Sequence, residues 1–117
     1  MKARLVAFGE VEVNGEHYDH DIVIMAGAVK RRKKGPSKPF HDEYEHTPLS
    51  VAENLPWGGK QLIVGTGVYG KLPVMPAVVA EAQRRGIKLI ALPTAEACQY
   101  LSSVKRRETY AVLHVTC

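Results

Sequence analysis

Polar and apolar residues alternate over the first third of the chain, and this pattern predicts antiparallel strands. Residues 10–13 read Glu-Val-Glu-Val, and the Asn14-Gly15 pair that follows is a strong signal for a two-residue hairpin turn. We expect the chain to return over residues 18–25 and to turn again at Ala26-Gly27. The first third should therefore form β-hairpins.

The register of the second hairpin places opposite charges across from one another. A turn at Ala26-Gly27 sets Met25 opposite Ala28, and the pairs that follow are Val23 with Lys30, Asp21 with Arg32, and Asp19 with Lys34. We therefore interpret Asp19 and Asp21 as structural partners of the basic strand rather than as acid–base carboxylates.

The middle of the chain is expected to be a long connection followed by one short helix. Residues 33–46 contain Pro36, Pro39, several charges and little periodicity, so this stretch is predicted to be exposed and irregular. Thr47-Pro48 then supplies an N-cap followed by proline at the first helical position, which predicts a short helix over residues 49–55.

The second half alternates between buried strands and amphipathic helices. An apolar run at 62–64, a helix over about 76–85 and a second apolar run at 87–92 form a strand–helix–strand unit with a right-handed parallel crossover. Thr94 can cap a further helix, and residues 109–116 supply a last strand. These elements predict an α/β fold with N-terminal β-hairpins and a C-terminal βαβαβ unit.

Composition agrees with one folded domain. The 117 residues are 45% hydrophobic and 24% charged, the usual mix of a globular chain, so residues 1–117 are assigned to a single domain. Apolar stretches such as 72–80 are far too short to cross a membrane. Cys98 and Cys117 are too few for a disulfide framework, and residues 1–4 lead into no apolar signal core, so we expect free thiols in a cytoplasmic protein.

The positive charge is concentrated in one segment. Lysine and arginine number 16 against 12 aspartate and glutamate, and six of the basic residues lie between Lys30 and Lys38. No aromatic residues interleave them to stack on bases, so a solvated strand and loop is favoured, with nucleic-acid binding through Lys30–Lys38 as an alternative. Arg84-Arg85 and Lys105–Arg107 are expected at helix C-termini, where cations stabilise the helix dipole.

A glycine-rich loop follows the apolar run at 62–64. Residues 65–70 read Gly-Thr-Gly-Val-Tyr-Gly and match the G-x-G-x-x-G pattern of dinucleotide-binding loops. Pro73 and Pro76 delay the next helix, and no acidic residue stands where a ribose would be bound. A tight structural turn is therefore favoured over nicotinamide or flavin binding, and no cofactor is assigned.

This glycine loop and the Pro93-Thr94 corner are expected to meet, because the loops after adjacent parallel strands open on the same edge of a sheet. Two helix N-termini would then direct backbone amides at an anion, with hydroxyl groups to orient it. The predicted ligand-binding residues are Gly65, Thr66, Gly67, Tyr69, Gly70, Lys71, Pro93 and Thr94.

The histidines and cysteines predict neither a metal site nor a catalytic group. The chain has five histidines, but none of them forms a zinc-type pair in sequence, so no metal site is predicted. Spacing brings no histidine to Cys98 or Cys117, and the catalytic residues of any reaction are left unassigned.

Four segments together resemble one small single-domain family. They read Tyr-Asp-His-Asp-Ile-Val-Ile at 18–24, Leu-Ile-Val-Gly-Thr-Gly-Val-Tyr-Gly at 62–70, Leu-Pro-Thr-Ala-Glu-Ala at 92–97 and His-Val-Thr-Cys at 114–117. The family is named for a methanogen structural-genomics domain and includes an adipogenesis-associated protein and a mitochondrial complex I assembly factor. The resemblance implies a three-layer α/β fold with a mixed central sheet, and it brings no established reaction.

Three functions are carried forward from the sequence. The leading hypothesis is a non-enzymatic, cytoplasmic interaction or assembly-type domain, whose partner is a protein or a small anionic ligand. The anionic ligand would be held at the edge formed by Gly65–Lys71 and Pro93-Thr94. An enzyme or cofactor-binding protein would use the same edge, with Lys71 against a phosphate and Tyr69 as an acid. The third is nucleic-acid binding through Lys30–Lys38. No membrane is expected as a partner, and the oligomeric state stays open.

Overall fold

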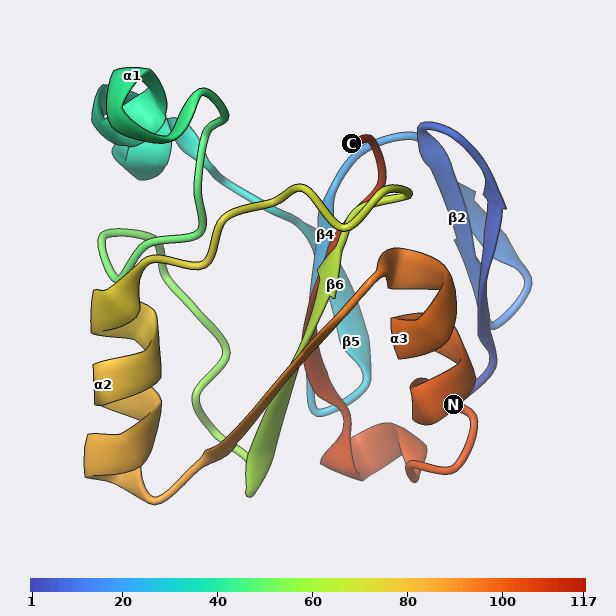
Figure 1. The fold of residues 1–117 in the computed structure, drawn as a ribbon. Coiled ribbons are helices and arrows are strands. Elements are labelled where there is room, and N and C mark those ends of the chain that lie inside the picture. The colour runs from blue at the N-terminus through green and yellow to red at the C-terminus, as the bar shows by residue number, and fades with distance from the viewer.

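The computed structural model describes all residues 1–117, which form two β-sheets and several helices (Figure 1). The smaller sheet consists of β1 (Ala3–Ala7), β2 (Glu10–Val13) and β3 (Glu16–Tyr18), in that order. The larger sheet has the order β5 (Ala28–Arg31), β4 (Ile22–Met25), β8 (Tyr110–His114), β6 (Gln61–Thr66) and β7 (Lys88–Leu92). The helices are η1 (Gly35–Phe40), α1 (His41–Tyr44), α2 (Pro76–Arg85), α3 (Thr94–Leu101) and η2 (Arg106–Glu108).

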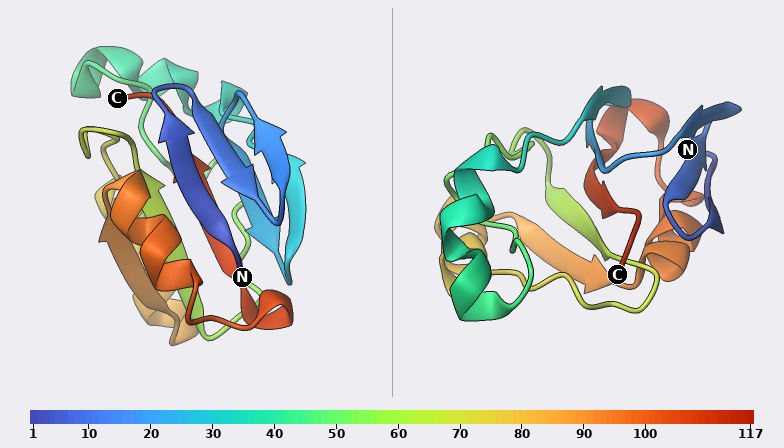
Figure 2. Two further views of the ribbon diagram at one scale, coloured as in Figure 1. Left: turned by 90° about the vertical axis from the view of Figure 1, so that its right-hand side faces the viewer. Right: turned by 90° about the horizontal axis from the view of Figure 1, so that it is seen from above.

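The larger sheet is the middle of three layers. Helix α2 covers one face, and α3 together with the smaller sheet covers the other (Figures 1 and 2). Each interface has its own apolar core: Leu62, Val64 and Val78 belong to the α2 side, whereas Ile63 and Leu101 belong to the α3 side. The three-layer fold that the family resemblance implied is confirmed.

Strand β8 makes the larger sheet mixed. It lies antiparallel to β4, with Val112 opposite Val23, and parallel to β6, with Val112 opposite Val64. Strands β6 and β7 are parallel neighbours joined through α2, so the predicted strand–helix–strand unit is confirmed.

Both predicted hairpin turns are present. Asn14 and Gly15 have φ values of 50° and 86°, and Ala26 and Gly27 have 49° and 82°, the left-handed pairs that a two-residue hairpin turn requires. Met25 lies opposite Ala28 and Val23 opposite Lys30, as the sequence predicted. The expected continuous return over 18–25 is wrong, because the chain leaves the smaller sheet after β3 and enters the larger sheet at β4.

The middle of the chain differs from its sequence interpretation. Residues 49–55 form no helix; instead Leu49 pairs with Val74 in an isolated bridge and donates its N–H to the Pro73 carbonyl oxygen at 2.8 Å. Leu49 and Leu55 are buried on the α2 side, so their apolar spacing reflects packing rather than a helical period. The preceding stretch, residues 33–46, is not irregular, since it contains η1 and α1.

The predictions for the two smaller basic clusters differ in their outcomes. Arg84-Arg85 closes α2 before Gly86, whose φ is 68°, as expected. Helix α3 ends at Leu101, so Lys105–Arg107 lies outside it, beside and within η2, and its expected helix-end position is wrong. None of the helices has the length and apolar character needed to cross a membrane.

Candidate functional site

The glycine loop and the Pro93-Thr94 corner meet at one edge of the larger sheet, as expected from the parallel β6–β7 pair. Gly67 N–H donates to Thr94 Oγ1 at 2.8 Å, and Thr94 N–H donates to the Gly67 carbonyl oxygen at 2.9 Å. Residues 115–117 also reach this edge. We call residues 65–71, 93–94 and 115–117 the rim.

Residues 115–117 occupy the amides that were expected to face an anion. Val68 N–H donates to the Thr116 carbonyl oxygen at 2.7 Å, and the N–H groups of Tyr69 and Lys71 donate to the Cys117 carbonyl oxygen at 3.1 and 3.0 Å. An anion could reach these donors only by displacing residues 116–117. In this arrangement the loop amides bind the protein's own backbone.

The glycines of the loop permit this close approach. Gly67 has a φ of 106°, and a Cβ there would lie 2.2 Å from the Cys117 carbonyl carbon. A Cβ on Gly65 would lie 2.9 Å from Thr94 Oγ1. The structure therefore assigns these two glycines the packing role that the sequence favoured.

The expectation that two helix N-termini converge on the rim is wrong. Only α3 begins there; residues 72–75 run across the sheet edge to α2 (Figure 1), and Met75 N–H donates to the Leu49 carbonyl oxygen at 3.0 Å. Thr94 is the first residue of α3 rather than its cap. Its buried hydroxyl donates to the His114 carbonyl oxygen at 2.5 Å, so it cannot orient a ligand as donor. Thr66 is also buried.

Two aromatic side chains at the rim are exposed. Tyr69 is 67% exposed and Phe8, in the turn between β1 and β2, is 56% exposed. Their ring centroids lie 6.2 Å apart. Gly9 N–H donates to the Val115 carbonyl oxygen at 2.8 Å, which anchors the turn carrying Phe8 to the rim. We call Phe8 and Tyr69 the aromatic pair. No pattern in the sequence indicated Phe8 as part of a site.

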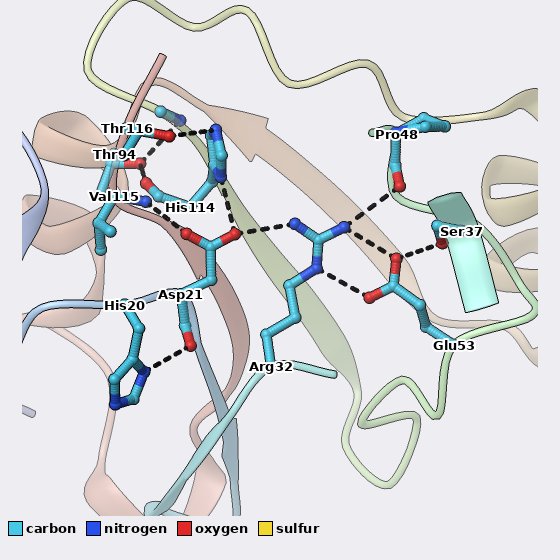
Figure 3. A network of polar contacts seen from close by, with 11 residues as sticks. His20, Asp21, Arg32, Ser37, Pro48, Glu53, Thr94, His114, Val115 and Thr116 are labelled. Carbon is cyan, nitrogen blue, oxygen red and sulfur yellow. Dashed lines mark hydrogen bonds and ion pairs between the residues drawn. The ribbon is translucent and has the colours of Figure 1, made fainter. Parts of the chain in front are cut away.

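A buried polar network lies next to the rim (Figure 3). Asp21 Oδ2 accepts from Arg32 Nη1 at 2.9 Å and lies 2.7 Å from His114 Nδ1, while Asp21 Oδ1 accepts from Val115 N–H at 2.9 Å. Burial alone would raise the pKa of Asp21, but the hydrogen bond and charge of His114, the hydrogen bond from Val115 and the positive charge of Arg32 more than offset it and hold the pKa at about 2. Asp21 is thus a fixed carboxylate.

Arg32 is the centre of this network and not part of the solvated segment expected from the sequence. Its Nε and Nη2 donate to the two oxygens of Glu53, both at 2.8 Å, and Nη2 also donates to the Pro48 carbonyl oxygen at 3.2 Å. Ser37 Oγ donates to Glu53 at 2.5 Å. Burial would lower the pKa of Arg32, but the hydrogen bond and charge of Glu53, together with Asp21, raise it.

The sequence predicted part of this network. The hairpin register placed Asp21 opposite Arg32, and that contact is confirmed by the ion pair and by Arg32 N–H donating to the Asp21 carbonyl oxygen at 2.9 Å. Asp19 and Lys34, the next predicted pair, form no ion pair, because the paired strands end at Ile22 and Arg31. Nothing in the spacing indicated Glu53.

His114 links the network to a hydroxyl group. His114 Nε2 lies 3.2 Å from Thr116 Oγ1, so with its Nδ1–H donated to Asp21 the imidazole can accept the Thr116 proton. In this arrangement the carboxylate corresponds to the residue that orients a base, the imidazole to the base, and the hydroxyl to the nucleophile that the base activates. The only sequence signal was that His114 and Thr116 share a face of an extended strand.

Both cysteines are free thiols. Cys98 is buried against the α3 side of the core, and burial raises the pKa of its thiol to about 11. Cys117 is partly exposed at the rim. Cys98 therefore contributes packing rather than reactivity.

Comparisons with known proteins find similarity over the whole fold. Residues 4–114 match a family described as "Protein of unknown function (DUF498/DUF598)". The conserved hypothetical protein PH1505 from Pyrococcus horikoshii is 30% identical, with a TM-score of 0.76 and 100% coverage of both chains. The protein MT938 is 24% identical, with a TM-score of 0.69, 95% of this chain and 94% of that chain being covered.

More distant structures share the fold alone. An outer membrane protein from Bartonella henselae is 13% identical, with a TM-score of 0.62 and coverage of 99% of this chain and 97% of that chain. Among proteins with curated descriptions, none matches this chain.

Proposed function

Because the chain belongs to the DUF498/DUF598 family of proteins of unknown function, whose description assigns no activity, we propose its role from the rim itself. The proposed role is that of a non-enzymatic interaction or assembly-type domain, which binds a partner protein through the aromatic pair. An assembly role, like that of the complex I assembly factor included in the family that the sequence resembles, would use the same surface. The two free thiols support the cytoplasmic location that we include in the proposal.

The observation that carries this proposal is the exposure of the aromatic pair. Large aromatic side chains are usually buried, and those that bind partner proteins supply much of the affinity at an interface. Phe8 and Tyr69 come from two segments that the Gly9–Val115 hydrogen bond holds in place. The pair is therefore anchored and needs little ordering when a partner binds.

The anionic group expected at this edge is proposed to be a carboxylate of the partner protein rather than a separate small ligand. The loop amides already donate to residues 116–117, whereas the Lys71 side chain is exposed and forms no ion pair. We therefore propose that Lys71 meets a carboxylate of the partner, beside an apolar side chain that covers the aromatic pair.

The test replaces the aromatic pair and compares it with a matched change elsewhere. The variant is Phe8→Ser with Tyr69→Ser, and the control is Val51→Ser with Val79→Ser, two exposed apolar residues away from the rim. Immobilised wild type and control should retain the same specific protein from the native cytosol, identified by mass spectrometry, and the rim variant should lose it. Equal retention by all three proteins, with unchanged circular dichroism, would contradict the proposal.

A second candidate function, an enzyme, is favoured by the Asp21–His114–Thr116 chain. Here His114 would take the proton of the Thr116 hydroxyl as its oxygen attacks an ester carbonyl, and would return that proton to the departing alcohol as the ester C–O bond breaks. Water activated by His114 would then hydrolyse the acyl-Thr116 ester, with Asp21 orienting the imidazole throughout. Hydrolysis of p-nitrophenyl acetate should then be lost in Thr116→Val and retained in Thr116→Ser. A wild-type rate no higher than that of Thr116→Val would count against this candidate.

A further inference from the structure

Two basic segments that are far apart in sequence meet at one end of the molecule. The turn that joins β4 to β5 lies beside η2 (Figure 1), and Gly27 N–H donates to the Thr109 carbonyl oxygen at 3.2 Å. The approach is so close that a Cβ on Gly27 would lie 2.6 Å from Arg106 Cγ. Residues 26–28 and 105–107 together line an open hollow of about 650 Å³.

A second hollow continues this surface along β5. It has a volume of about 300 Å³, shares Ala28 with the first hollow, and takes basic side chains from the edge strand and the residues after it. We call the combined surface the basic face, and its basic residues are Lys30, Arg31, Lys33, Lys105, Arg106 and Arg107. All six are exposed, and none forms an ion pair.

The basic face accounts for the net positive charge of the protein. Without its six residues, the 16 lysines and arginines fall to 10, against 12 aspartates and glutamates. Glu53 also lines the second hollow, but both its oxygens accept from Arg32. Glu108, at the end of η2, lines a neighbouring hollow with Arg107 and forms no ion pair. The charge is thus concentrated on one surface and poorly compensated there.

We propose that the basic face binds the phosphate backbone of a double-stranded nucleic acid, without reading its sequence. A protein that neutralises a phosphate backbone presents cations from several segments on one surface, and the structure brings the basic residues of 30–33 and 105–107, which are far apart in sequence, onto one surface. This surface is distinct from the rim.

The absence of a stacking platform on this face favours a duplex over a single strand. Tyr110 lines a neighbouring hollow, but Gly58 and Gly59 pack against its ring so closely that a Cβ on Gly59 would lie 2.3 Å from Tyr110 Cδ1. Backbone therefore packs against one side of the ring, and Tyr110 is partly buried. Single-stranded nucleic acids are usually bound by exposed aromatic faces, whereas duplex backbones are bound by charge.

The experiment measures how binding depends on salt. Fluorescence anisotropy with a labelled DNA duplex of about 20 base pairs, titrated between about 50 and 200 mM salt, gives the slope of log K against log[salt]. Six phosphate contacts would give a slope of roughly −5, and removing two of them should make the slope shallower by about 2.

Two variants and a matched control locate the site. Arg106→Gln with Arg107→Gln removes two charges from one segment, and Lys30→Gln with Arg31→Gln removes two from the other. The control, Lys2→Gln with Lys88→Gln, changes the net charge equally from exposed lysines outside the basic face. Both face variants should weaken binding and flatten the slope, the control should match the wild type, and Glu108→Gln should tighten binding.

Several results would overturn the proposal. The wild type would show no salt-dependent binding, or the control variant would lose as much affinity as the two face variants. The proposal would also fail if only the Lys30–Arg31 variant bound more weakly, or if polyglutamate of matched charge bound as tightly as the duplex. The aromatic-pair variant should bind the duplex normally, so failure here leaves the proposed rim function separately testable.

Discussion

Replacement of Arg32 by methionine should be among the most destabilising single changes in this protein. The guanidinium is 1% exposed and lies 2.9 Å from Asp21 and 2.8 Å from Glu53, whose side chains are 9% and 2% exposed. Methionine keeps the apolar stem but leaves two buried carboxylates without their shared cation. The free energy of unfolding should therefore fall.

The expected loss is about 3 to 5 kcal/mol, the usual cost of leaving a buried charge unpaired. Small domains are commonly stable by about 5 to 15 kcal/mol, so such a loss removes a large part of the total. The matched control is Arg31→Met, the neighbouring exposed residue without an ion pair, for which a change within about 0.5 kcal/mol is expected.

Urea unfolding, followed by circular dichroism, measures the difference. Urea is preferred to guanidinium because it is uncharged and does not screen the ion pairs. Acidification supplies an internal check: the wild type loses the stabilisation that comes from the depressed pKa of Asp21 as the pH falls from about 4 toward 2, whereas Arg32→Met lacks part of that stabilisation, so the gap between the two proteins should narrow over this range. A loss below about 1 kcal/mol, or a gap independent of pH, would refute the reasoning.

Three further predictions concern the rim, the buried polar network and the two thiols. Gly67→Ala should destabilise the fold by about 2 kcal/mol or more, because alanine is strained at a φ of 106° and its Cβ would clash with Cys117; an unchanged urea midpoint would be inconsistent with that contact. The pKa of Asp21 is depressed from 3.8 to about 2, so its contribution of about 2 kcal/mol should be present above pH 4 and lost as the pH falls toward 2; Asp21→Asn should flatten this dependence in acid titrations followed by fluorescence. In the folded protein a thiol reagent such as DTNB should label Cys117 readily and Cys98 only on unfolding, because burial raises the pKa of Cys98 to about 11; two rapidly reacting thiols would contradict this.

The parts of the fold that were predictable are those set by local rules. Asn14-Gly15 and Ala26-Gly27 adopt the left-handed turn conformations that fix the hairpin register, and that register led to the Asp21–Arg32 pair. The apolar runs of β6 and β7 identified two parallel strands. β6 is almost wholly buried because both faces of the sheet are covered there, whereas β7, at the edge of the sheet, is only partly buried.

The errors arose where long-range contacts outweigh local preference. Thr47-Pro48 and the spacing of Leu49 and Leu55 are typical of a helix start, yet Leu49 bonds with residues 73–75 and both leucines pack on the sheet. Lys105–Arg107 was interpreted as a helix end because it follows an apolar-periodic segment, yet α3 ends at Leu101 and these residues lie beside the β4–β5 turn. Neither contact has a local signature.

The position of the candidate site could be predicted from the sequence, but the contacts that form it could not. Parallel strand order placed the loop after β6 beside Pro93-Thr94, and their hydrogen bonds confirm this meeting. Three other features of the site depend on tertiary packing alone. Residues 116–117 fill the glycine loop, Phe8 lies beside Tyr69, and Glu53 pairs with Arg32. Spacing along the chain contains no information on such contacts.

The position of β8 sets the order in which this sheet can assemble. β8 follows every other strand in sequence yet lies at the centre of the sheet, between the earlier β4–β5 and β6–β7 pairs. Until β8 has been synthesised, each of those pairs presents an unfilled inner edge, and exposed edges of this kind invite pairing with other chains. We therefore expect the nascent chain to gain cooperative structure only late in translation, through slow closure of distant segments rather than by growth from a local nucleus.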